Sequence, residues 1–443
     1  MRTKEELKKI ICDAIDKRRE EIIALGDSIF DEPELGFKEF KTAAKFKAVL
    51  DELNIPYEDE IAITGVKAKL EGKSDKYTIA VMGELDSVVS PNHPNADKET
   101  GAAHCCGHNC MMAGIAGVAY AFADTDVMKE LDGNLAIIAV PAEEYVEIGF
   151  RKSLIEQGRT MFAGGKQEFI RLGALDDVDV TLIQHTFGSE VEGNKIVAGA
   201  GDSSNGFVGQ EITFIGKEAH AGGAPHRGIN ALAAAQVAFT AINAQRETFL
   251  EKDYIRVHPI ITKGGDLVNV VPAEVKIETY VRGSNIEAIK DATEKVTRSW
   301  KAGADALGAK VRIETLAGYM PYEAEKNLEE ITYQNMVALF GEERSQKHGG
   351  HGTGSSDIGD VAAIMPTLQF RIGGANDRFH SDEYRLCDKD LAYLGAAKIL
   401  AMDVIDLLYD NAAATKAIVD NFKPVFTKEE YLEQWGKIGE TYK

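Results

Sequence analysis

The 443 residues exceed the size at which a single hydrophobic core keeps growing, so the length predicts two or more domains. Apolar residues make up 44% of the chain and charged residues 27%, the proportions of an ordinary soluble globular protein. The net charge of −21 argues against nucleic acid and anionic membranes as partners.

The five cysteines bear on the cellular compartment. Three of them, Cys105, Cys106 and Cys110, fall within six residues, and an odd total does not suit a disulfide framework. This usage is typical of a reducing compartment. The first residues are charged and helical without a signal-peptide apolar region, and no stretch approaches a membrane span of about 20 apolar residues. We therefore expect a cytoplasmic protein with no membrane partner.

Helical patterns precede the first strand. Thr3 followed by Glu6 is a capping-box pattern, and the helix that it opens is expected to extend to about Leu25. An amphipathic pattern over 42–53 predicts a second helix, which Pro56 ends.

Three short apolar runs, 77–82, 134–140 and 179–183, have the composition of buried strands, and helical segments lie between them. The alternation of strand and helix predicts an α/β fold with a parallel sheet covered on both faces. In such sheets ligands bind beyond the carboxyl ends of the strands. Asp86, Glu144 and His185 follow the three runs at that end.

The pattern changes at about residue 203. Runs 207–214 and 274–282 alternate apolar and polar residues, as half-exposed antiparallel strands do. Two long helical runs, 231–249 and 285–307, accompany them. Two helices on one face of a small antiparallel sheet predict an inserted α+β domain of a common size.

The parallel-sheet pattern resumes near Asn327, with a strand over 366–370 and a closing helix over 391–408. A charged, helical tail follows from Asn411. We therefore expect residues 1–203 and 317–443 to form one domain, and residues 204–316 to form the insert.

The segment 101–115 carries the triplet Cys106-Gly107-His108. A thiolate and an imidazole two residues apart, with glycine between them, can reach one cation from a tight turn. The apolar segment that follows is typical of a helix buried in a core. Taken alone, however, a buried cysteine is more often a small core residue than a ligand.

Other polar residues at predicted strand ends and loops extend this pattern. Each has a simpler explanation when taken singly, because adjacent glutamates can be a solvated pair and a loop histidine can be a surface residue. Jointly, their residue types form a ligand set for borderline transition metals. The set is Cys106, His108, Glu144, His185 and His380, with Glu143 beside it.

Eight ordered motifs resemble one family. They are PELGFKEFKTA (33–43), GELD (83–86), CCGHN (105–109), PAEE (141–144), GKEAHAGGAPHRGINAL (216–232), NVVPAEVKIETYVR (269–282), GSSDIGDV (354–361) and FHSDEY (379–384). The family is that of the co-catalytic metallopeptidases, which includes aminoacylases, carboxypeptidase G and the plant auxin-conjugate amidohydrolases. Asn109, where many amidohydrolases have aspartate, together with GELD resembles the aminobenzoyl-glutamate hydrolase branch.

The resemblance implies a fold and a cofactor. The fold is a zinc-peptidase-like catalytic domain with a mostly parallel sheet, and an inserted α+β, ferredoxin-like domain that acts as lid and dimerisation surface. The cofactors are two divalent metal ions, with Mn(II) as the first choice and Zn(II) as the second. The expected assembly is a homodimer through the lid domain.

The resemblance also implies roles for individual residues. Cys106 would bridge the two metals. Glu143 would be the general base, and Asp86 would orient a metal-binding histidine. The further ligands would be His108, Glu144, His185 and His380.

In the lid, His220 would reach toward the substrate, and Asn269 and Arg282 would lie near its carboxylate. Two features depart from the family pattern. Cys105 stands beside Cys106 and could compete as a ligand, and the segment between Glu144 and the Gly164-Gly165-Lys166 triplet is longer than in many relatives.

These observations favour a metal-dependent amidohydrolase that cleaves the amide bond of an N-acyl or N-aroyl amino acid or a related dipeptide. The alternatives are hydrolytic deamination of a small aromatic amine on the same metal site, a catalytically inactive binding or regulatory homologue, and a hydrolase with a cysteine nucleophile. Deamination would use the same metal-activated water. An inactive homologue would be expected to have lost some of the base and ligand positions, all of which are present here. The activity of a cysteine-nucleophile hydrolase would survive chelation but not alkylation.

Overall fold

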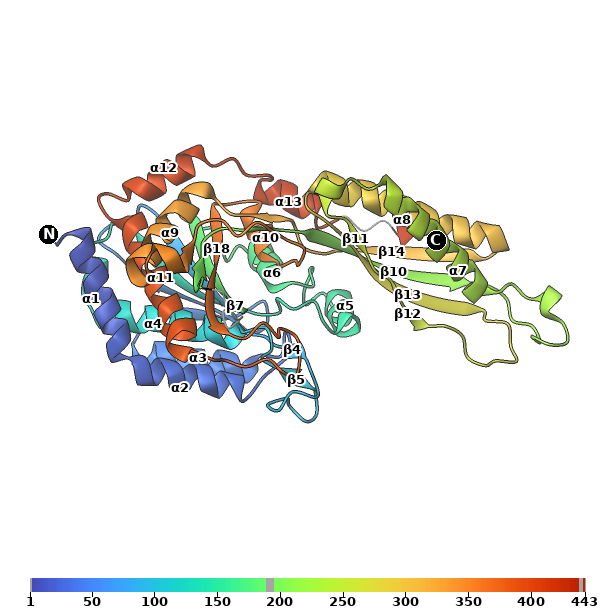
Figure 1. The fold of residues 1–443 in the computed structure, drawn as a ribbon, viewed down its shortest axis with the longest axis horizontal. Coiled ribbons are helices and arrows are strands. Elements are labelled where there is room, and N and C mark those ends of the chain that lie inside the picture. The colour runs from blue at the N-terminus through green and yellow to red at the C-terminus, as the bar shows by residue number, and fades with distance from the viewer. Residues whose placement is uncertain (1, 189–194, 438–440, 443) are drawn as a thin grey trace. The chain divides into compact units, whose positions relative to one another are not determined.

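The computed structural model describes residues 2–188, 195–437 and 441–442, which form two compact units (Figure 1). The first unit comprises Met1–Ser203, Glu323–Gly350 and Asp360–Lys428. The second comprises Ser204–Tyr322, His351–Gly359 and Glu429–Lys443. The predicted insert therefore lies within the second unit, which also includes the last residues of the tail.

Among the described residues, the first unit is built on an eight-stranded sheet in the order β1-β2-β6-β3-β7-β18-β8-β16. Its four central strands, from β6 to β18, are parallel to one another, and every residue of β3 and β6 is buried. Parallel strands need cover on both faces, which explains their continuous apolar runs. The bounds are β1 Tyr57–Ile61, β2 Gly65–Leu70, β3 Thr78–Glu84, β6 Asn134–Val140, β7 Val180–Gly188, β8 Ala198–Gly199, β16 Ser345–Gln346 and β18 Thr367–Ala375.

The mostly parallel α/β fold is thus confirmed, with two corrections at the level of elements. Strand β7 continues beyond residue 183, so His185 lies within the strand rather than after it. The reason is its parallel register with β18, which pairs His185 with Arg371. The tail is not wholly helical, because its end forms strand β19 (Thr441–Tyr442), which pairs with β14 (Lys310–Ala317).

The helices of the first unit begin with α1 (Lys4–Lys17), where the predicted capping box of Thr3 and Glu6 is present. The predicted first helix is interrupted at Arg18 and continues as α2 (Arg19–Phe30), beyond the expected end. Helix α3 covers Phe40–Glu52. The remaining helices here are α4 His108–Ala123, α5 Ile148–Glu156, α6 Gly165–Leu172, α9 Lys326–Phe340, α11 Ala396–Leu408 with a preceding π-helical turn Asp390–Gly395, and α12 Ala413–Asn421. Helix α10 (Ile358–Ala362) contains residues of both units, and α13 (Lys428–Gln434) belongs almost wholly to the second.

Helix α4 lies at the centre of this unit. It packs on β3 and β7, and helices α1, α2 and α11 pack on it (Figure 1). Every residue from His108 to Phe122 is buried, which explains why the helix is apolar all round rather than amphipathic. A rigid, enclosed helix is a suitable platform for chemistry at its first residue.

The second unit has an antiparallel sheet in the order β11-β13-β10-β14-β19, with β12 also paired to β13. Its long strands are β10 (Gly206–Ile215) and β13 (Glu274–Gly283), and the sheet packs against helices α7 (Ala231–Gln245) and α8 (Ile286–Leu307). The α+β prediction is therefore confirmed. The short strands of the chain are β4 Val88–Val89, β5 Ala102–Ala103, β9 Ser203–Ser204, β11 Arg256–Val257, β12 Ile260–Lys263, β15 Tyr322–Glu323 and β17 His351–Gly352.

A buried carboxyl group in α11 makes stability depend on pH. Asp403 accepts hydrogen bonds from Thr332 Oγ1 (2.6 Å) and Asn335 Nδ2 (2.7 Å) of α9. Burial raises the pKa of Asp403 to about 7, because the two hydrogen bonds do not offset the loss of hydration. A raised pKa favours the protonated form in the folded state. The resulting stabilisation is fully present below the unfolded pKa and is lost as the pH rises through about 7.

We expect Asp403→Asn to remove this dependence. Between pH 5 and 7 the wild-type free energy of unfolding should fall relative to that of the variant by on the order of 1 kcal/mol per pH unit. Urea unfolding followed by circular dichroism at several pH values measures the difference. Parallel pH profiles for the two proteins would show that Asp403 does not titrate in this range.

Candidate active site

Cys106 and His108 lie at the turn that opens α4. Gly107, between them, has a φ of 89°, in the left-handed region that glycine adopts without strain. A Cβ atom at this position would lie 2.1 Å from Oγ1 of Thr186. Glycine is therefore required if the cysteine and the histidine are to come from one tight turn.

Asp86 orients His108. Nδ1 of His108 lies 2.9 Å from the backbone oxygen of Asp86 and 3.2 Å from its Oδ1. Both partners are acceptors, so Nδ1 carries a proton and Nε2 is the ring nitrogen that faces the other donor atoms. The other carboxylate oxygen of Asp86 accepts a hydrogen bond from the backbone N–H of Glu144 at 2.9 Å. One aspartate thus positions two segments of the site, as carboxylates behind metal-binding histidines usually do.

The five predicted ligands come together in two sets of donor atoms, each set lying within 4.8 Å. Cys106, His108 and His185 form the first set, in which Sγ of Cys106 is 3.4 Å from Nε2 of His185. Cys106 also belongs to the second set, with Glu144 and His380, where Nε2 of His380 is 3.2 Å from Oε1 of Glu144. This is the arrangement that a bridging cysteine between two cations requires.

A further set among the described residues consists of Glu84, His108 and Glu143. Glu84 is absent from the sequence-based ligand prediction. It is the last residue of the apolar strand β3, two positions before Asp86, and is 1% exposed. The sequence held a signal for Glu84, because a carboxylate is rare at the end of a buried strand. Residues two apart in a strand also lie on the same side, which places Glu84 with Asp86.

The donor atoms fit divalent cations. Nε2 of His108 and Oε2 of Glu84 are buried and face each other at 2.9 Å, and the buried Oε1 of Glu144 faces Nε2 of His380 at 3.2 Å. Burial opposes the charged form of His108, yet the neighbouring Glu84 and Cys106 raise its pKa well above the ordinary value. The cluster therefore attracts positive charge. Thiol, imidazole and carboxylate together suit zinc and manganese.

The adjacent Glu143 and Glu144 serve different sides of the site. Residue 142 before them is an alanine with a φ of 57°, a strained conformation that breaks the alternation of the strand. The buried Glu39 holds this bend by accepting the N–H of Ala142 at 2.8 Å. Burial and the charges of Glu84 and Glu144 raise the pKa of Glu143 well above its ordinary value. For Glu144 burial acts in the same direction, but the hydrogen bond and charge of His380 lower the pKa.

Residues 80–401 match the model of peptidase family M20/M25/M40. The chain belongs to this family. The match covers most of the chain and includes the Cys106 turn, Glu143, Glu144, His185 and His380. The family assignment confirms the resemblance seen in the motifs, and it makes the chain a hydrolase of C–N bonds from a metal-dependent family.

Among curated relatives, a mouse Xaa-Arg dipeptidase is 26% identical over 97% of this chain and 95% of its own length. An N-acyl-L-amino acid amidohydrolase of Geobacillus stearothermophilus is 26% identical over 79% of this chain and 85% of its own length. A Bacillus subtilis structure described as a dinuclear metal-binding M20 peptidase superposes with a TM-score of 0.67. It is 22% identical and covers 89% of this chain and 99% of its own. This likeness shows the shared fold.

Arg151 is a buried residue of α5 that the sequence did not single out. Its guanidinium donates to four backbone carbonyls: those of Val146 (2.8 Å), Ala142 (3.0 Å), Glu144 and Ala163. Three of these carbonyls belong to residues 142–146, beside Glu143 and Glu144, and the fourth belongs to Ala163 at the end of the long loop. The guanidinium of Arg151 therefore ties the two ends of the loop together and stabilises the strained bend at Ala142. The role of Arg151 could not be seen in the sequence, because its hydrogen-bond partners are backbone carbonyls, which every residue type has.

We expect Arg151→Met to lower kcat by roughly 10- to 100-fold, because a displacement of about 1 Å in a site can cost this much. The methionine fills the volume but leaves the carbonyls of the glutamate loop without their donor. Arg159→Met is the matched control, because Arg159 is an exposed residue of the same loop. Steady-state kinetics of both variants tests the expectation. Equal kcat values in the two variants would show that Arg151 does not hold the site.

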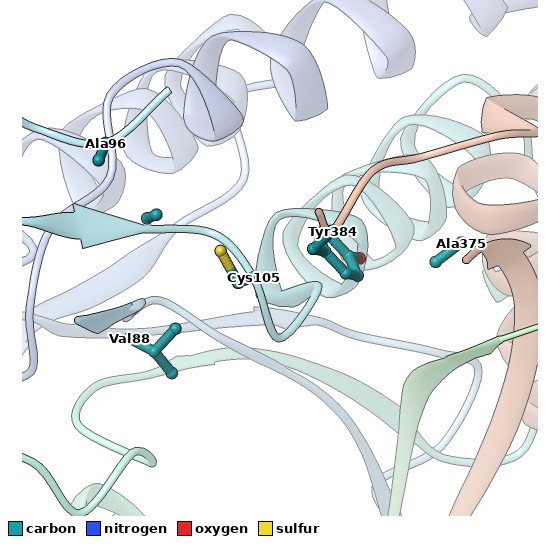
Figure 2. Packing of buried hydrophobic residues seen from close by; sticks show 6 residues of the cluster. Val88, Ala96, Cys105, Ala375 and Tyr384 are labelled. Carbon is teal, nitrogen blue, oxygen red and sulfur yellow. The ribbon is translucent and has the colours of Figure 1, made fainter. Parts of the chain in front are cut away.

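Cys105 does not join the donor sets among the described residues. It is fully buried in an apolar cluster that also contains Val88, Ala96, Ala375 and Tyr384 (Figure 2). Consecutive side chains of an extended segment point to opposite sides, so the cluster holds Cys105 while Cys106 faces the donor atoms.

The predicted substrate-binding residues His220, Asn269 and Arg282 belong to the second unit. Nδ1 of His220 accepts the N–H groups of Gly222 (3.2 Å) and Gly223 (3.0 Å), so the ring proton is on Nε2. The backbone oxygen of Asn269 accepts the N–H of Ala221, which brings these two segments together. Arg282 lies on β13 and donates to Ser355 Oγ at 2.8 Å. Their roles toward a substrate stay predictions.

Among the described residues, none of the helices has both the length and the apolar character that crossing a membrane requires.

Proposed function

We propose that the chain is a dinuclear amidohydrolase that cleaves the amide bond of an N-acyl or N-aroyl amino acid, or of a related dipeptide. The observation that supports it is the pair of donor sets sharing Cys106, with the buried Glu143 beside them. Relatives named for cleaving dipeptides and N-acyl amino acids cover most of the chain, which favours this substrate class.

The proposed ligands are Cys106, as the bridge, with His108, Glu144, His185 and His380. When bound, two divalent cations would lower the pKa of a water molecule and polarise the amide carbonyl. Manganese is our first choice, because the amidohydrolase branch that the motifs resemble commonly uses it, and carboxylate ligands suit it. Zinc is the second choice, because thiolate and imidazole suit zinc.

Glu143 is the proposed general base. It would accept a proton from the attacking water as the C–O bond forms, and donate it to the amine nitrogen as the C–N bond breaks. A catalytic carboxyl works best when its pKa lies near the working pH. Burial and two neighbouring carboxylates act on Glu143 in that direction. Asp86 would keep His108 in the tautomer that leaves Nε2 free.

The second unit would contribute substrate contacts and the subunit interface of a cytoplasmic homodimer. His220, with its proton on Nε2, would donate to the substrate, and Asn269 and Arg282 would bind its carboxylate. The paired strand β12 exposes Ile260, and the loop after it exposes Val268 fully. Exposed apolar side chains beside a strand are typical of interaction surfaces. Sedimentation velocity tests the dimer, and a monomer at micromolar concentration would contradict it.

A hydrolysis screen of the manganese-loaded protein, followed by mass spectrometry, tests the function. The panel contains N-acetyl amino acids, aminobenzoyl-glutamate, indoleacetyl-amino acids, dipeptides and small aromatic amines. Cleavage of one amide class that a chelator abolishes would support the proposal. Loss of ammonia from an aromatic amine would favour deamination, and cleavage that survives chelation but not thiol alkylation would favour a cysteine nucleophile.

A further inference from the structure

Glu84 and Lys166 form a buried ion pair beside the donor sets. Glu84 is 1% exposed and Lys166 is fully buried. Nζ of Lys166 lies 2.5 Å from Oε1 of Glu84. The pair joins the last residue of β3 to the first turn of α6, directly after the long loop. Burying two charges costs free energy of hydration that their mutual attraction often fails to offset.

The second oxygen of Glu84 is not used by this ion pair. Oε2 lies 2.9 Å from Nε2 of His108, and neither atom has a further hydrogen-bond partner among the described residues. Nε2 is the ring nitrogen of His108 that is not directed at Asp86. A proton shared by Nε2 and Oε2 satisfies both atoms in the metal-free protein, and a cation that both atoms bind would take its place.

The distance suits a shared cation. Ligand atoms about 2.1 Å from a metal ion lie roughly 3 Å apart when they subtend a right angle. Oε2 of Glu143 is 3.8 Å from the same Nε2, which completes the third donor set. Glu84 thus has one oxygen held by Lys166 and the other facing Nε2 of His108.

We propose that Glu84 is an additional metal ligand, binding the cation that His108 binds, and that Lys166 is a positioning residue. This inference rests on the proposed dinuclear function. Lys166 holds Oε1 and thereby directs Oε2 at the cation. An additional oxygen ligand raises the coordination number above the four that zinc prefers, and so favours manganese at this position.

Four proteins distinguish a ligand from a mere ion-pair partner: wild type, Glu84→Gln, Lys166→Met and the double variant. The double variant removes both charges of the ion pair and keeps the volume of the two side chains. Metal analysis after gel filtration gives the number of manganese ions per chain, and chelator competition gives their affinities. Asp403→Asn is the matched control, because it neutralises a buried carboxylate outside the three donor sets.

The wild type and the control are expected to bind two manganese ions per chain. Glu84→Gln should weaken one of them at least 10-fold, and the double variant should be equally weak. Lys166→Met should still bind both ions, because Glu84 is present, but should bind one of them more weakly than the wild type, because Oε1 of Glu84 is no longer held. The preference for manganese over zinc should fall in both proteins that lack Glu84.

Recovery of full affinity in the double variant would overturn the inference, because Glu84 would then serve only to pair with Lys166. Unchanged affinity in Glu84→Gln would overturn it as well. In either case the proposed function would stand, since two ions would still bind. A wild-type protein that binds no cation would overturn the proposed function and this inference together. Thermal unfolding of the metal-free proteins shows that each variant is folded.

Discussion

Glu143→Ala is expected to lower kcat roughly 10²- to 10⁴-fold while the protein still binds two metal ions. The reason is that general acid–base catalysis contributes about this factor, and no other carboxyl group is proposed for the proton transfer. Glu143 is buried beside His108, with Oε2 at 3.8 Å from Nε2. Initial rates on the substrate identified by the screen, together with metal analysis of the same sample, measure both effects.

Glu156→Ala is the control for this prediction, because Glu156 is exposed at the end of α5 in the same loop. It should retain wild-type kcat. If Glu143→Ala loses a metal ion together with turnover, the base and the ligand are exchanged between Glu143 and Glu144. If it retains full turnover, another group carries the proton and the proposed mechanism is wrong.

Cys106→Ala is expected to abolish the binding of both metal ions, whereas His380→Ala should weaken only one. The physical reason is that Cys106 belongs to two donor sets and His380 to one. Loss of the shared thiolate removes one ligand from each of the two cations and so weakens the binding of both. Metal content per chain after gel filtration, measured at equal protein concentration, separates the two outcomes.

Cys105→Ala is the matched control, since Cys105 lies in the apolar cluster with Val88 and Tyr384 (Figure 2). It should bind two metal ions and lose only some stability, because a small buried side chain is shortened. The reverse result, with metal lost in Cys105→Ala and kept in Cys106→Ala, would show that Cys105, and not Cys106, bridges the two metal ions.

Much of the fold could be predicted because apolar runs and helix signals are local. The run 134–140 coincides with strand β6, and the capping box at Thr3 opens α1 as expected. The ends of other elements depend on neighbours. Strand β7 extends through His185 because its register with β18 continues, which no property of the run itself specifies.

The candidate site divides in the same way. The five ligand positions could be nominated because each lies in a contiguous motif or at the end of an apolar run. Glu84 and Arg151 were not nominated, because neither could be given a partner from the sequence. Glu84 meets Lys166 across 82 residues, and Arg151 serves backbone carbonyls that any residue type could supply.

By itself the sequence determined the family, the parallel sheet with its α+β insert, and the residue types gathered at the strand ends. Only the tertiary structure decided that Cys106 is common to two donor sets, that Cys105 is not in them, and that Glu84 faces His108. The physical reason is that periodicity specifies which side of an element is buried, whereas side-chain direction depends on the bend at Gly107 and on packing between distant segments.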